Sequence, residues 1–568
     1  MGRPEKIRLG DILVAQRLIS LEELKIALDE QKKSGRKLGR VLIEQGFVND
    51  EQICEAISRQ LNIPYVNLKY FNFNQDVVRR LPEAAARRFR AVVLEDHATA
   101  YLVGMSDPTD LFAYDEIARQ LKRDIEAAVV SEAALLNTID RVYRRTEEIS
   151  GLAKELEREV GEGYVDFGAL GAAAGAEDAP VVKLLQSVFE DAVQVNASDV
   201  HIEPQEEHVQ IRFRIDGALM PQSEAAPRIA PALALRLKLM AGLDISEKRL
   251  PQDGRFHVLV REQKIDVRMS TMPTQYGETV VLRLLNRRAT LQSLESLGMP
   301  RETLERFRDM IRRTAGMVLV TGPTGSGKTT TLYAALSALN TPDRKIITVE
   351  DPVEYRLDGI SQVQVNEKID LSFARVLRST LRQDPDIILV GEVRDEETAQ
   401  IALRAALTGH LVLSTVHTKD SASTPLRLID MGAPNYMVAT SVHGVVAQRL
   451  LRLICESCIE EHHPDPYEER WLTTQLGAGY EGRKFFRGRG CAHCNGTGFS
   501  GRTGVYEMLE MTPELARAVN QADPNSFVEA ARVQLKGRTL ADRALEVVLQ
   551  GRTTVAEAVK VAVQVEEG

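Results

Sequence analysis

Aromatic residues are scarce in this sequence, and positive charge is not in excess. Only one of the 568 residues is tryptophan, aromatic residues make up 5%, and the net charge is −9. Proteins that bind single-stranded nucleic acid combine aromatic stacking platforms with a basic surface, and neither is a general feature of this chain. The composition therefore disfavours a protein that acts on nucleic acid.

Cysteines and long apolar runs are scarce as well. Five cysteines in so long a chain do not suggest a disulfide scaffold, which favours a protein of the reducing cytosol. No apolar run approaches the roughly eighteen residues of a membrane span, and the N-terminal MGRPEKIRLGD has no apolar signal segment. We therefore expect a cytoplasmic protein that reaches membranes only through partners.

Apolar periodicity divides the chain into successive parts. Residues 1–145 are predicted to form a mainly helical domain with short strands, and residues 146–178 a flexible linker. Residues 179–290 alternate apolar and polar positions around turns, which is typical of a small α+β domain. Residues 291–568 alternate buried strands with helices and end in a helical tail, which predicts a parallel α/β sheet.

A phosphate-binding loop is predicted in GPTGSGKTT, which matches G-x-x-x-x-G-K-[ST] between an apolar strand and a helix. Its glycines let backbone amides turn inward, and the helix N-terminus adds its dipole. Lys328 is expected to reach the β- and γ-phosphates, and Thr329 to bind Mg²⁺. A chance glycine-rich turn is the alternative. The predicted site comprises Gly322, Pro323, Thr324, Gly325, Ser326, Gly327, Lys328, Thr329 and Thr330.

Two acidic clusters follow the phosphate-binding loop. The strand in DIILVGEVRD ends at Glu392, and Gly391 occupies the position that usually holds aspartate in a Walker B segment. The segment TVEDPVEY places Glu350 and Glu354 at the end of another strand. A carboxylate in such a place can polarise water or hold the hydration shell of a metal ion. A surface acid at a strand terminus is the alternative for each.

A histidine segment, GHLVLSTVHT, places His410 and His417 at opposite ends of a strand, where packed and catalytic histidines are equally expected. These four segments, in this order, resemble the secretion ATPases, which are the hexameric motors of type II secretion and type IV pilus assembly. The resemblance implies a RecA-like motor domain preceded by a PAS-like α+β domain. It also implies that Glu392 is the catalytic glutamate, that Glu350 and Glu354 are acidic-box carboxylates, and that both histidines belong to the site.

The same resemblance implies that arginines act at the ATP site. They are Arg268 and Arg283 in the preceding domain, and Arg378, Arg382 and Arg394 near the Walker B strand. A guanidinium over the γ-phosphate would neutralise charge in the transition state. By residue type alone, these arginines are also consistent with solvated surface charges.

Four of the five cysteines form two C-x₂-C pairs, CESC and CAHC, within residues 450–505. Cys455, Cys458, Cys491 and Cys494 are predicted to bind Zn²⁺ in a closed tetrahedral site, which is structural because no position stays open. Unmetallated thiols are the alternative. Pilus-extension and secretion motors resemble this chain in carrying such an insert and retraction motors lack it, which implies assembly.

Residues 8–31 and 37–60 are two copies of one unit, RLGDILVAQRLISLEELKIALDEQ and KLGRVLIEQGFVNDEQICEAISRQ. Each reads as two short helices, and Ser20-x-x-Glu23 and Asn49-x-x-Gln52 are capping boxes. The tandem units are similar to the cyclic-di-GMP-binding domain of MSHA-type pilus motors.

That similarity implies a regulatory ligand, cyclic-di-GMP, at Arg8, Leu9, Gly10, Lys37, Leu38 and Gly39. Paired cations near exposed Leu-Gly turns suit a ligand with two phosphates and two guanines. Two departures from the pattern are Arg17, which replaces a glycine, and Lys37, which replaces an arginine. A helical docking module for a membrane partner is the alternative.

The sequence as a whole predicts a cytoplasmic homohexameric ATPase that uses ATP and Mg²⁺, carries structural Zn²⁺ and responds to cyclic-di-GMP. By resemblance, its expected function is extension of an MSHA-like type IV pilus through an inner-membrane platform protein, which would place it at the cytoplasmic face of that membrane. A type II secretion ATPase is the nearest alternative. A RecA-like motor that translocates nucleic acid is a more distant one.

Overall fold

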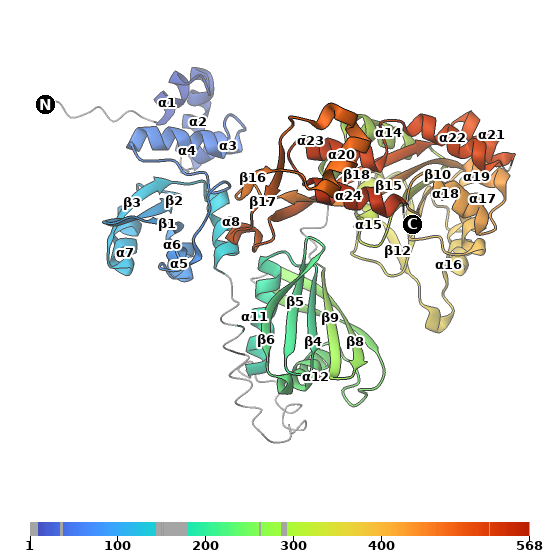
Figure 1. Ribbon diagram of the computed structural model, residues 1–568, viewed down its shortest axis with the longest axis horizontal. Helices are drawn as coiled ribbons and strands as arrows, with labels where there is room; N and C mark the ends of the chain where they lie inside the picture. The colour runs from blue at the N-terminus through green and yellow to red at the C-terminus, as the bar shows by residue number, and fades with distance from the viewer. Residues whose placement is uncertain are drawn as a thin grey trace. The chain divides into compact units, whose positions relative to one another are not determined.

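The computed structural model describes residues 9–34, 38–143, 180–260, 263–285, 292–521 and 523–566, together with Ile149 and Leu152. Arg8, Lys37 and almost all of the predicted linker lie outside these residues. Contacts divide the chain into two compact units (Figure 1), one of which joins residues 1–148 to residues 455–459 and 488–499. Among the described residues, no helix is both long and apolar enough to cross a membrane.

The duplicated motif forms four helices with one shared core. These are α1 (Leu9–Ala15), α2 (Leu21–Ser34), α3 (Leu38–Glu44) and α4 (Asp50–Leu61). The buried residues Leu13 and Ile19 of the first copy pack in the same cluster as Leu42 and Ile53 of the second. Because α1 lies against α4 and α2 against α3, each copy completes the core of the other.

Both predicted capping boxes are confirmed. The Asn49 side chain accepts from the Gln52 N–H at 2.8 Å, and the Gln52 side chain accepts from the Asn49 N–H at 2.9 Å. Ser20 and Glu23 exchange the equivalent pair of hydrogen bonds at 3.2 and 2.7 Å. These bonds satisfy amides at the helix starts that lack intrahelical partners, so local sequence fixes where α2 and α4 begin.

The rest of the N-terminal domain (residues 9–143) is a three-stranded sheet with helices. Its strands are β1 (Ala91–Asp96), β2 (Ala100–Met105) and β3 (Asp124–Val129), in the order β1-β2-β3. Its helices are α5 (Gln75–Val78), α6 (Glu83–Phe89), α7 (Leu111–Leu121) and α8 (Glu132–Val142). Phe73 and the buried strand residues form a second core beside that of the duplicated helices.

The middle domain (residues 180–285) pairs helices with a six-stranded antiparallel sheet, ordered β6-β5-β4-β9-β8-β7. The strands are β4 (Asp199–Pro204), β5 (Val209–Ile215), β6 (Ala218–Ala225), β7 (Gln252–Val260), β8 (Gln263–Thr274) and β9 (Gly277–Leu285). The helices are α11 (Pro180–Gln194), η2 (Pro227–Ile229) and α12 (Ala230–Met240). Alternating burial along β5 confirms the predicted period of two.

The C-terminal domain (residues 292–454, 460–487 and 500–566) is built around a seven-stranded sheet, ordered β12-β11-β13-β14-β10-β15-β18. The first six strands in this order pair in parallel. The strands are β10 (Gly316–Thr321), β11 (Ile346–Glu350), β12 (Ser361–Gln364), β13 (Ile387–Val390), β14 (Leu411–Val416), β15 (Val442–Ile454) and β18 (Phe499–Glu510). The carboxyl ends of parallel strands meet at one edge, which is where such sheets bind ligands.

Both faces of this sheet are covered. Met317 and Leu319 of β10 pack in one buried cluster, whereas Val318 and Val320 pack in another. The covering helices are α14 (Arg301–Ile311), α15 (Lys328–Leu339), α16 (Phe373–Thr380), α17 (Glu396–Leu407), α18 (Ser423–Asp430), α19 (Asn435–Ser441), α20 (Pro466–Leu476), α21 (Pro513–Asn520), α22 (Pro524–Leu535), α23 (Leu540–Leu549) and α24 (Val555–Glu566), with short turns η3 (Leu294–Leu297), η4 (Glu367–Ile369) and η5 (Gly477–Tyr480). Burial on both faces explains why these strands are uninterrupted apolar runs.

An insertion separates β15 from β18 in the sequence. It contains the two-stranded sheet of β16 (Ile459–His462) and β17 (Phe485–Gly488), and the short turn η6 (Ala492–Cys494). Residues 455–459 and 488–499 of this insertion, here called the Cys₄ module, belong to the same compact unit as the N-terminal domain.

Candidate functional site

The phosphate-binding loop lies between the carboxyl end of β10 and the start of α15. Gly322, Gly325 and Gly327 have φ values of 145°, 81° and 90°, which side-chain-bearing residues rarely adopt. A Cβ atom on Gly322 would lie 2.5 Å from the Gln448 carbonyl oxygen, and one on Gly327 would lie 2.7 Å from Gln448 Nε2. A Cβ on Gly325 would meet nothing within 4 Å, so this part of the loop faces open space.

Lys328 is folded back onto the loop that precedes it. Its Nζ donates to the Gly322 carbonyl at 2.7 Å and to the Pro323 carbonyl at 3.0 Å. Burial lowers the pKa of Lys328 to about 8, against the attraction of Glu392, which raises it. The ammonium therefore has replaceable partners and a position from which it can turn to a phosphate.

Two polar residues of β15, Gln448 and Arg449, support this loop and were not predicted. Gln448 Nε2 donates to the Ser326 carbonyl at 2.8 Å, and its Oε1 accepts from the Thr331 hydroxyl at 2.7 Å. Arg449 is 4% exposed and donates to the carbonyls of Gln448 and Lys419. A polar pair inside the apolar run VVAQRLL was the signal in the sequence, because buried polar side chains need partners.

The predicted donors fit a nucleotide phosphate. The Ser326 hydroxyl is buried without a hydrogen-bond partner among the described residues, and Thr329 is half-buried at the N-terminal turn of α15. Buried polar atoms normally have partners, so the orphaned hydroxyl points to a missing polar ligand. A hydroxyl at the position of Thr329 is the usual protein ligand of Mg²⁺ beside such a loop.

Glu392 follows β13 at the same edge of the sheet as the phosphate-binding loop. Its side chain is 13% exposed and forms ion pairs with Arg394 and with His417, whose Nε2 lies 3.3 Å from Glu392 Oε2. A Cβ on the preceding Gly391 would lie 3.2 Å from the Val349 carbonyl oxygen, a tight contact that favours glycine at this position. Glycine in place of the usual aspartate avoids this close contact with the end of β11.

Glu350 ends β11 and points into the core. It is 4% exposed, and it accepts hydrogen bonds from the side chains of Tyr333, Thr348 and Gln362. Burial, with the charge and hydrogen bond of Glu350, raises the pKa of Tyr333 above its usual value. These bonds fix the end of β11 and the segment that follows it.

The structure separates some of the predicted residues from this edge. His410 precedes β14 at the opposite end from His417, and its Nδ1 contacts the Ala405 carbonyl at 2.9 Å. Because β14 pairs in parallel with β10, His410 lies at the edge away from the phosphate-binding loop of its own chain, and its role at the site stays a prediction. Arg378 and Arg382 are exposed on and after α16, and Arg378 pairs with Glu397.

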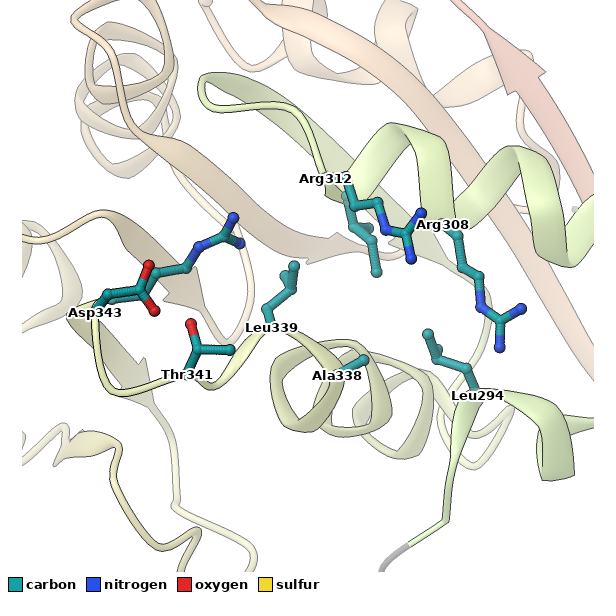
Figure 2. A pocket seen from close by; sticks show the side chains of 9 residues that line it. Leu294, Arg308, Arg312, Ala338, Leu339, Thr341 and Asp343 are labelled. Carbon is teal, nitrogen blue, oxygen red and sulfur yellow. The ribbon is translucent and has the colours of Figure 1, made fainter.

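A cavity of about 290 Å³ lies near the amino ends of β10 and β11, not near the phosphate-binding loop (Figure 2). Leu294 and Leu339 contribute to its lining, together with Arg308 of α14 and Arg312, which follows that helix. Arg308 also pairs with Glu295. This cavity holds none of the predicted site residues.

The middle domain contributes one predicted arginine to the acidic box. Arg268 Nη1 lies 3.0 Å from Glu354 Oε2, and Nη2 donates to the Val353 carbonyl at 2.6 Å. Burial lowers the pKa of Arg268, while Glu354 raises it. Arg283, which pairs directly with Arg268 across β8 and β9, instead contacts Asp199 at 3.1 Å and is 54% exposed.

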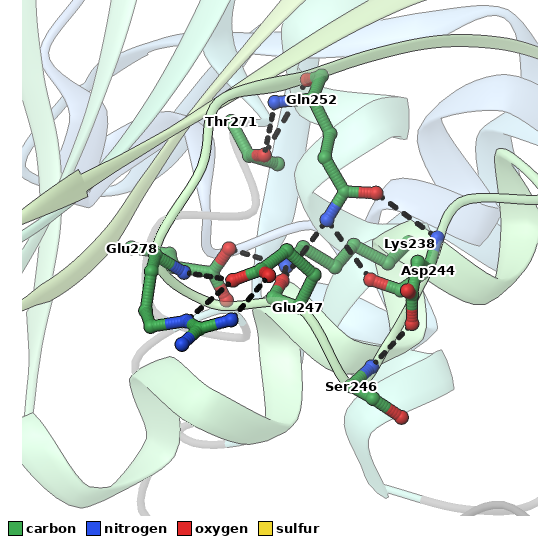
Figure 3. Close-up of polar contacts among 8 residues, drawn as sticks. Lys238, Asp244, Ser246, Glu247, Gln252, Thr271 and Glu278 are labelled. Atoms are coloured by element: carbon green, nitrogen blue, oxygen red, sulfur yellow. Dashed lines mark hydrogen bonds and ion pairs between the residues drawn. The ribbon is translucent and has the colours of Figure 1, made fainter.

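A buried lysine fixes the strand that pairs with Arg268 (Figure 3). Lys238 is 1% exposed, forms an ion pair with Glu278 and donates to the Glu247 carbonyl at 2.7 Å. Gln252 donates to the Asp244 and Glu247 carbonyls at 2.9 and 3.0 Å. Gln252 is the first residue of β7, so these bonds fix the start of that strand. Because β7 pairs with β8, which carries Arg268, they also help to fix the position of Arg268.

The four predicted cysteine ligands converge. Their sulfur atoms all lie within 4.8 Å of one another, and three Sγ–Sγ separations, Cys455–Cys491, Cys458–Cys494 and Cys491–Cys494, are 3.8 Å. A tetrahedron with Zn–S bonds of about 2.3 Å has edges of about 3.8 Å, so the donor set fits Zn²⁺.

Backbone amides and tight turns complete the fit of the Cys₄ module. The N–H groups of Gly490 and Gly498 donate to the sulfurs of Cys458 and Cys494 at 3.3 and 3.1 Å. Hydrogen bonds from the Cys455 and Cys491 thiols lower the pKa of Cys494, whereas burial raises the pKa of Cys458. A Cβ on Gly488 would lie 1.9 Å from the Gly498 carbonyl, so the strands around the sulfurs meet backbone to backbone.

The Leu-Gly corners of the duplicated motif are buried rather than exposed, which corrects the prediction. A Cβ on Gly10 would lie 2.7 Å from Leu24 Cδ1, and one on Gly39 would lie 3.2 Å from Ile53 Cγ2. These glycines let the two helices of each copy meet, while Leu9 and Leu38 are half-buried. The paired cations, Arg8 and Lys37, lie outside the described residues.

The turn inside each copy requires a left-handed residue. Arg17 has φ 58° and Gly46, its counterpart, has φ 74°. Their N–H groups donate to the Val14 and Ile43 carbonyls at the same distance, 2.9 Å. The departure at Arg17 therefore keeps the turn, but in a conformation that costs a side-chain-bearing residue about 1 kcal/mol.

Comparisons with known proteins agree with this geometry. The profile of the type II/IV secretion system protein family matches residues 174–560, and that of the MshEN domain matches residues 61–149, after the two helical motifs. The type IV pilus assembly ATPase PilB of Myxococcus xanthus is 39% identical over 565 residues, which span 97% of this chain and 98% of that protein. The type II secretion system ATPase E of Vibrio cholerae is 40% identical over 494 residues, 85% of this chain and 97% of that protein.

Among solved structures, the ATPase DotB of Legionella pneumophila has a TM-score of 0.51 and 22% identity, covering 67% of this chain and 95% of that one. At that identity the likeness shows the fold alone. It confirms the predicted fold class, a multidomain α/β protein with a RecA-like P-loop domain.

The lowered pKa of Lys328 predicts a pH dependence of nucleotide binding. A lysine is charged below its pKa, so the affinity for ATP should be constant at neutral pH and weaken as the pH rises through about 8, approaching tenfold per pH unit. Titration with a fluorescent ATP analogue from about pH 6.5 to about pH 9.5 measures this. Lys328→Ala should bind weakly with no such dependence, and constant affinity of the wild type up to about pH 9 would contradict the prediction.

Proposed function

The chain belongs to the type II/IV secretion system protein family and is an ATPase, and we propose that it powers type IV pilus assembly as a homohexamer. The observation that carries this proposal is the glycine-rich loop at the carboxyl end of β10, where Lys328 donates to the Gly322 carbonyl at 2.7 Å and Glu392 lies at the same edge of the parallel sheet. Support for the pilus assignment is 39% identity to a pilus assembly ATPase over almost the whole chain, against 37% to a type II secretion protein E over a similar share.

Hydrolysis is proposed to proceed by attack of water on the γ-phosphate of ATP. The amides of the loop and the Lys328 ammonium would bind the phosphates, and Thr329 would hold Mg²⁺, which would neutralise charge on the phosphate oxygens. Glu392 orients the water, because it is the carboxylate at the end of β13 beside that loop. His417, at 3.3 Å from Glu392, restrains that carboxylate. Glu350 acts through its buried hydrogen bonds by fixing the end of β11.

Oligomerisation gives the remaining arginines a role. Arg378 and Arg382 are exposed in the single chain and are proposed to face the ATP site of a neighbouring subunit, as the family resemblance implies. Arg268 already joins the middle domain to the acidic box through Glu354. Hydrolysis would alter this contact and so move the middle domain. That movement is proposed to act on an inner-membrane platform protein.

A type II secretion ATPase is the second candidate function. The secretion ATPase of Vibrio cholerae is as similar to this chain as the pilus ATPase, over a shorter stretch. The two candidates share the same site chemistry and differ in the structure assembled. Removing the gene from its host should abolish surface pili and spare protein secretion; loss of secretion with normal pili would favour the second candidate.

Glu392→Gln tests the catalytic assignment. Removing the charge while keeping the shape should lower kcat by about a hundredfold or more, with ATP affinity within about twofold. Steady-state phosphate release and nucleotide binding measure the two quantities. Glu367→Gln, at an exposed carboxylate of η4, is the matched control and should behave as the wild type. A Glu392→Gln enzyme with near-normal turnover would refute the role.

The Cys₄ module is proposed to hold one structural Zn²⁺. Elemental analysis of the freshly purified full chain should find about one zinc per chain, and Cys491→Ser should lose most of it. Cys54→Ser is a matched control, because Cys54 is the buried cysteine that does not belong to the cluster. Absence of zinc in the wild type, or equal loss in both variants, would contradict the assignment.

Cyclic-di-GMP is proposed to bind the duplicated motif and to regulate the motor. The support is the motif similarity and the adjoining MshEN match. Calorimetry on the full chain should show binding at micromolar concentrations, and Arg8→Ala and Lys37→Ala should each weaken it about tenfold by removing a phosphate or guanine contact. Lys25→Ala, on exposed α2, is the control and should bind normally. No heat of binding would leave the motif as a docking module.

A further inference from the structure

Each C-x₂-C pair of the Cys₄ module holds two residues between its cysteines. The four residues are Glu456, Ser457, Ala492 and His493. A closed metal site needs only the cysteines, so these positions are free to vary without loss of the ligands. In the structure, all four contact the N-terminal domain, which belongs to the same compact unit.

The first pair of cysteines meets the segment that follows the duplicated helices. Glu456 forms an ion pair with Lys69, and the Ser457 hydroxyl donates to the Lys69 carbonyl. The side chains of Lys69 and Glu456 are about half-exposed. Solvent therefore weakens their ion pair, which contributes to the orientation of the contact more than to its free energy.

The second pair of cysteines supplies the apolar part of the contact. The His493 ring is 6% exposed and lies 4.9 Å from the Phe73 ring, centroid to centroid. Phe73 also packs edge-on against Phe71 at 5.0 Å. Ala492 packs against the buried cluster that contains Phe73, and η6 lies against α8. A buried aromatic contact surrounded by polar groups is the usual anatomy of a specific interface.

We propose that the Cys₄ module is the docking site of the N-terminal domain of the same chain, and that bound metal shapes this docking site. Metal would fix the loops that present the four intervening residues, because those residues are bracketed by ligands. The module then has two roles. It stabilises its own fold, and it binds the N-terminal domain to the C-terminal part of the chain.

The sequence around the module shows where such docking can act. Strand β15 carries Gln448 and Arg449 at the phosphate-binding loop and ends one residue before Cys455. A change in the N-terminal domain that loosens Glu456 or Ser457 therefore acts on the end of a strand that supports the ATP site. This regulatory route rests on the proposed function, whereas the docking itself does not.

Hydrogen exchange of the full chain, measured without nucleotide, tests the docking. Lys69→Glu should speed amide exchange about two- to fivefold both around Phe73 and around His493, because like charges replace an ion pair. Adding Glu456→Lys should restore the wild-type rates in both segments. Lys484→Glu is the matched control, since Lys484 forms a comparable exposed ion pair with Glu461, and both residues belong to the other compact unit.

A second variant and a metal removal make the test stringent. Ala492→Glu should release both segments by about tenfold or more, because a carboxylate would enter an apolar contact, while metal content stays normal. Chelation of the metal from wild type should speed exchange at Lys69–Phe73. Unchanged exchange around Phe73 in Lys69→Glu and Ala492→Glu, or after metal loss, would overturn the proposal. Because no ATP or cyclic-di-GMP is present, such a failure would not bear on the ATPase assignment.

Discussion

The close approach of β15 to the phosphate-binding loop is the constraint on which the site depends. The Gln448 backbone and side chain leave no room for a Cβ on Gly322 or Gly327, so the loop must adopt conformations that glycine alone tolerates. Gln448 also ties the loop to the first turn of α15 through Ser326 and Thr331. The amides and Lys328 are therefore held in place before any phosphate arrives, which reduces the ordering that binding requires.

Close approach between neighbouring groups also bears on the glycine that replaces aspartate at Gly391 and on the glycines that the duplicated motif keeps. Gly391 stands in place of the expected aspartate where a Cβ would lie 3.2 Å from the Val349 carbonyl oxygen, and Glu392 then carries the carboxylate. In the duplicated motif, Gly10 and Gly39 lie where the two helices of one copy pack closely. The buried residues of the two copies form one shared core, so each copy buries apolar surface against the other.

The domains are linked by a few specific contacts. Arg268 of the middle domain forms an ion pair with Glu354 in the acidic box. The buried Lys238–Glu278 pair lies at the start of β9, which pairs with the strand that carries Arg268. The intervening residues of the two cysteine pairs meet the N-terminal domain in a similar way, with an aromatic contact and an ion pair. Such small interfaces can release and re-form at modest free-energy cost, as a motor that changes conformation requires.

The sequence by itself determined the glycine-rich loop between β10 and α15, the two C-x₂-C turns and the capping boxes, because each of these depends on residues close together in the chain. Glycine spacing, helix caps and C-x₂-C turns depend on residues within a few positions of one another, so they can be predicted from the sequence. Tertiary structure alone decided that Gln448 and Arg449 support the loop, that His410 lies at the opposite edge from His417, and that the Leu-Gly corners are buried. Those outcomes depend on strand order and on side chains brought together across more than a hundred residues, as Gln448 and Ser326 are. The spacing of residues in the sequence does not identify such partners, because the contacts of a buried side chain depend on which distant residues pack around it.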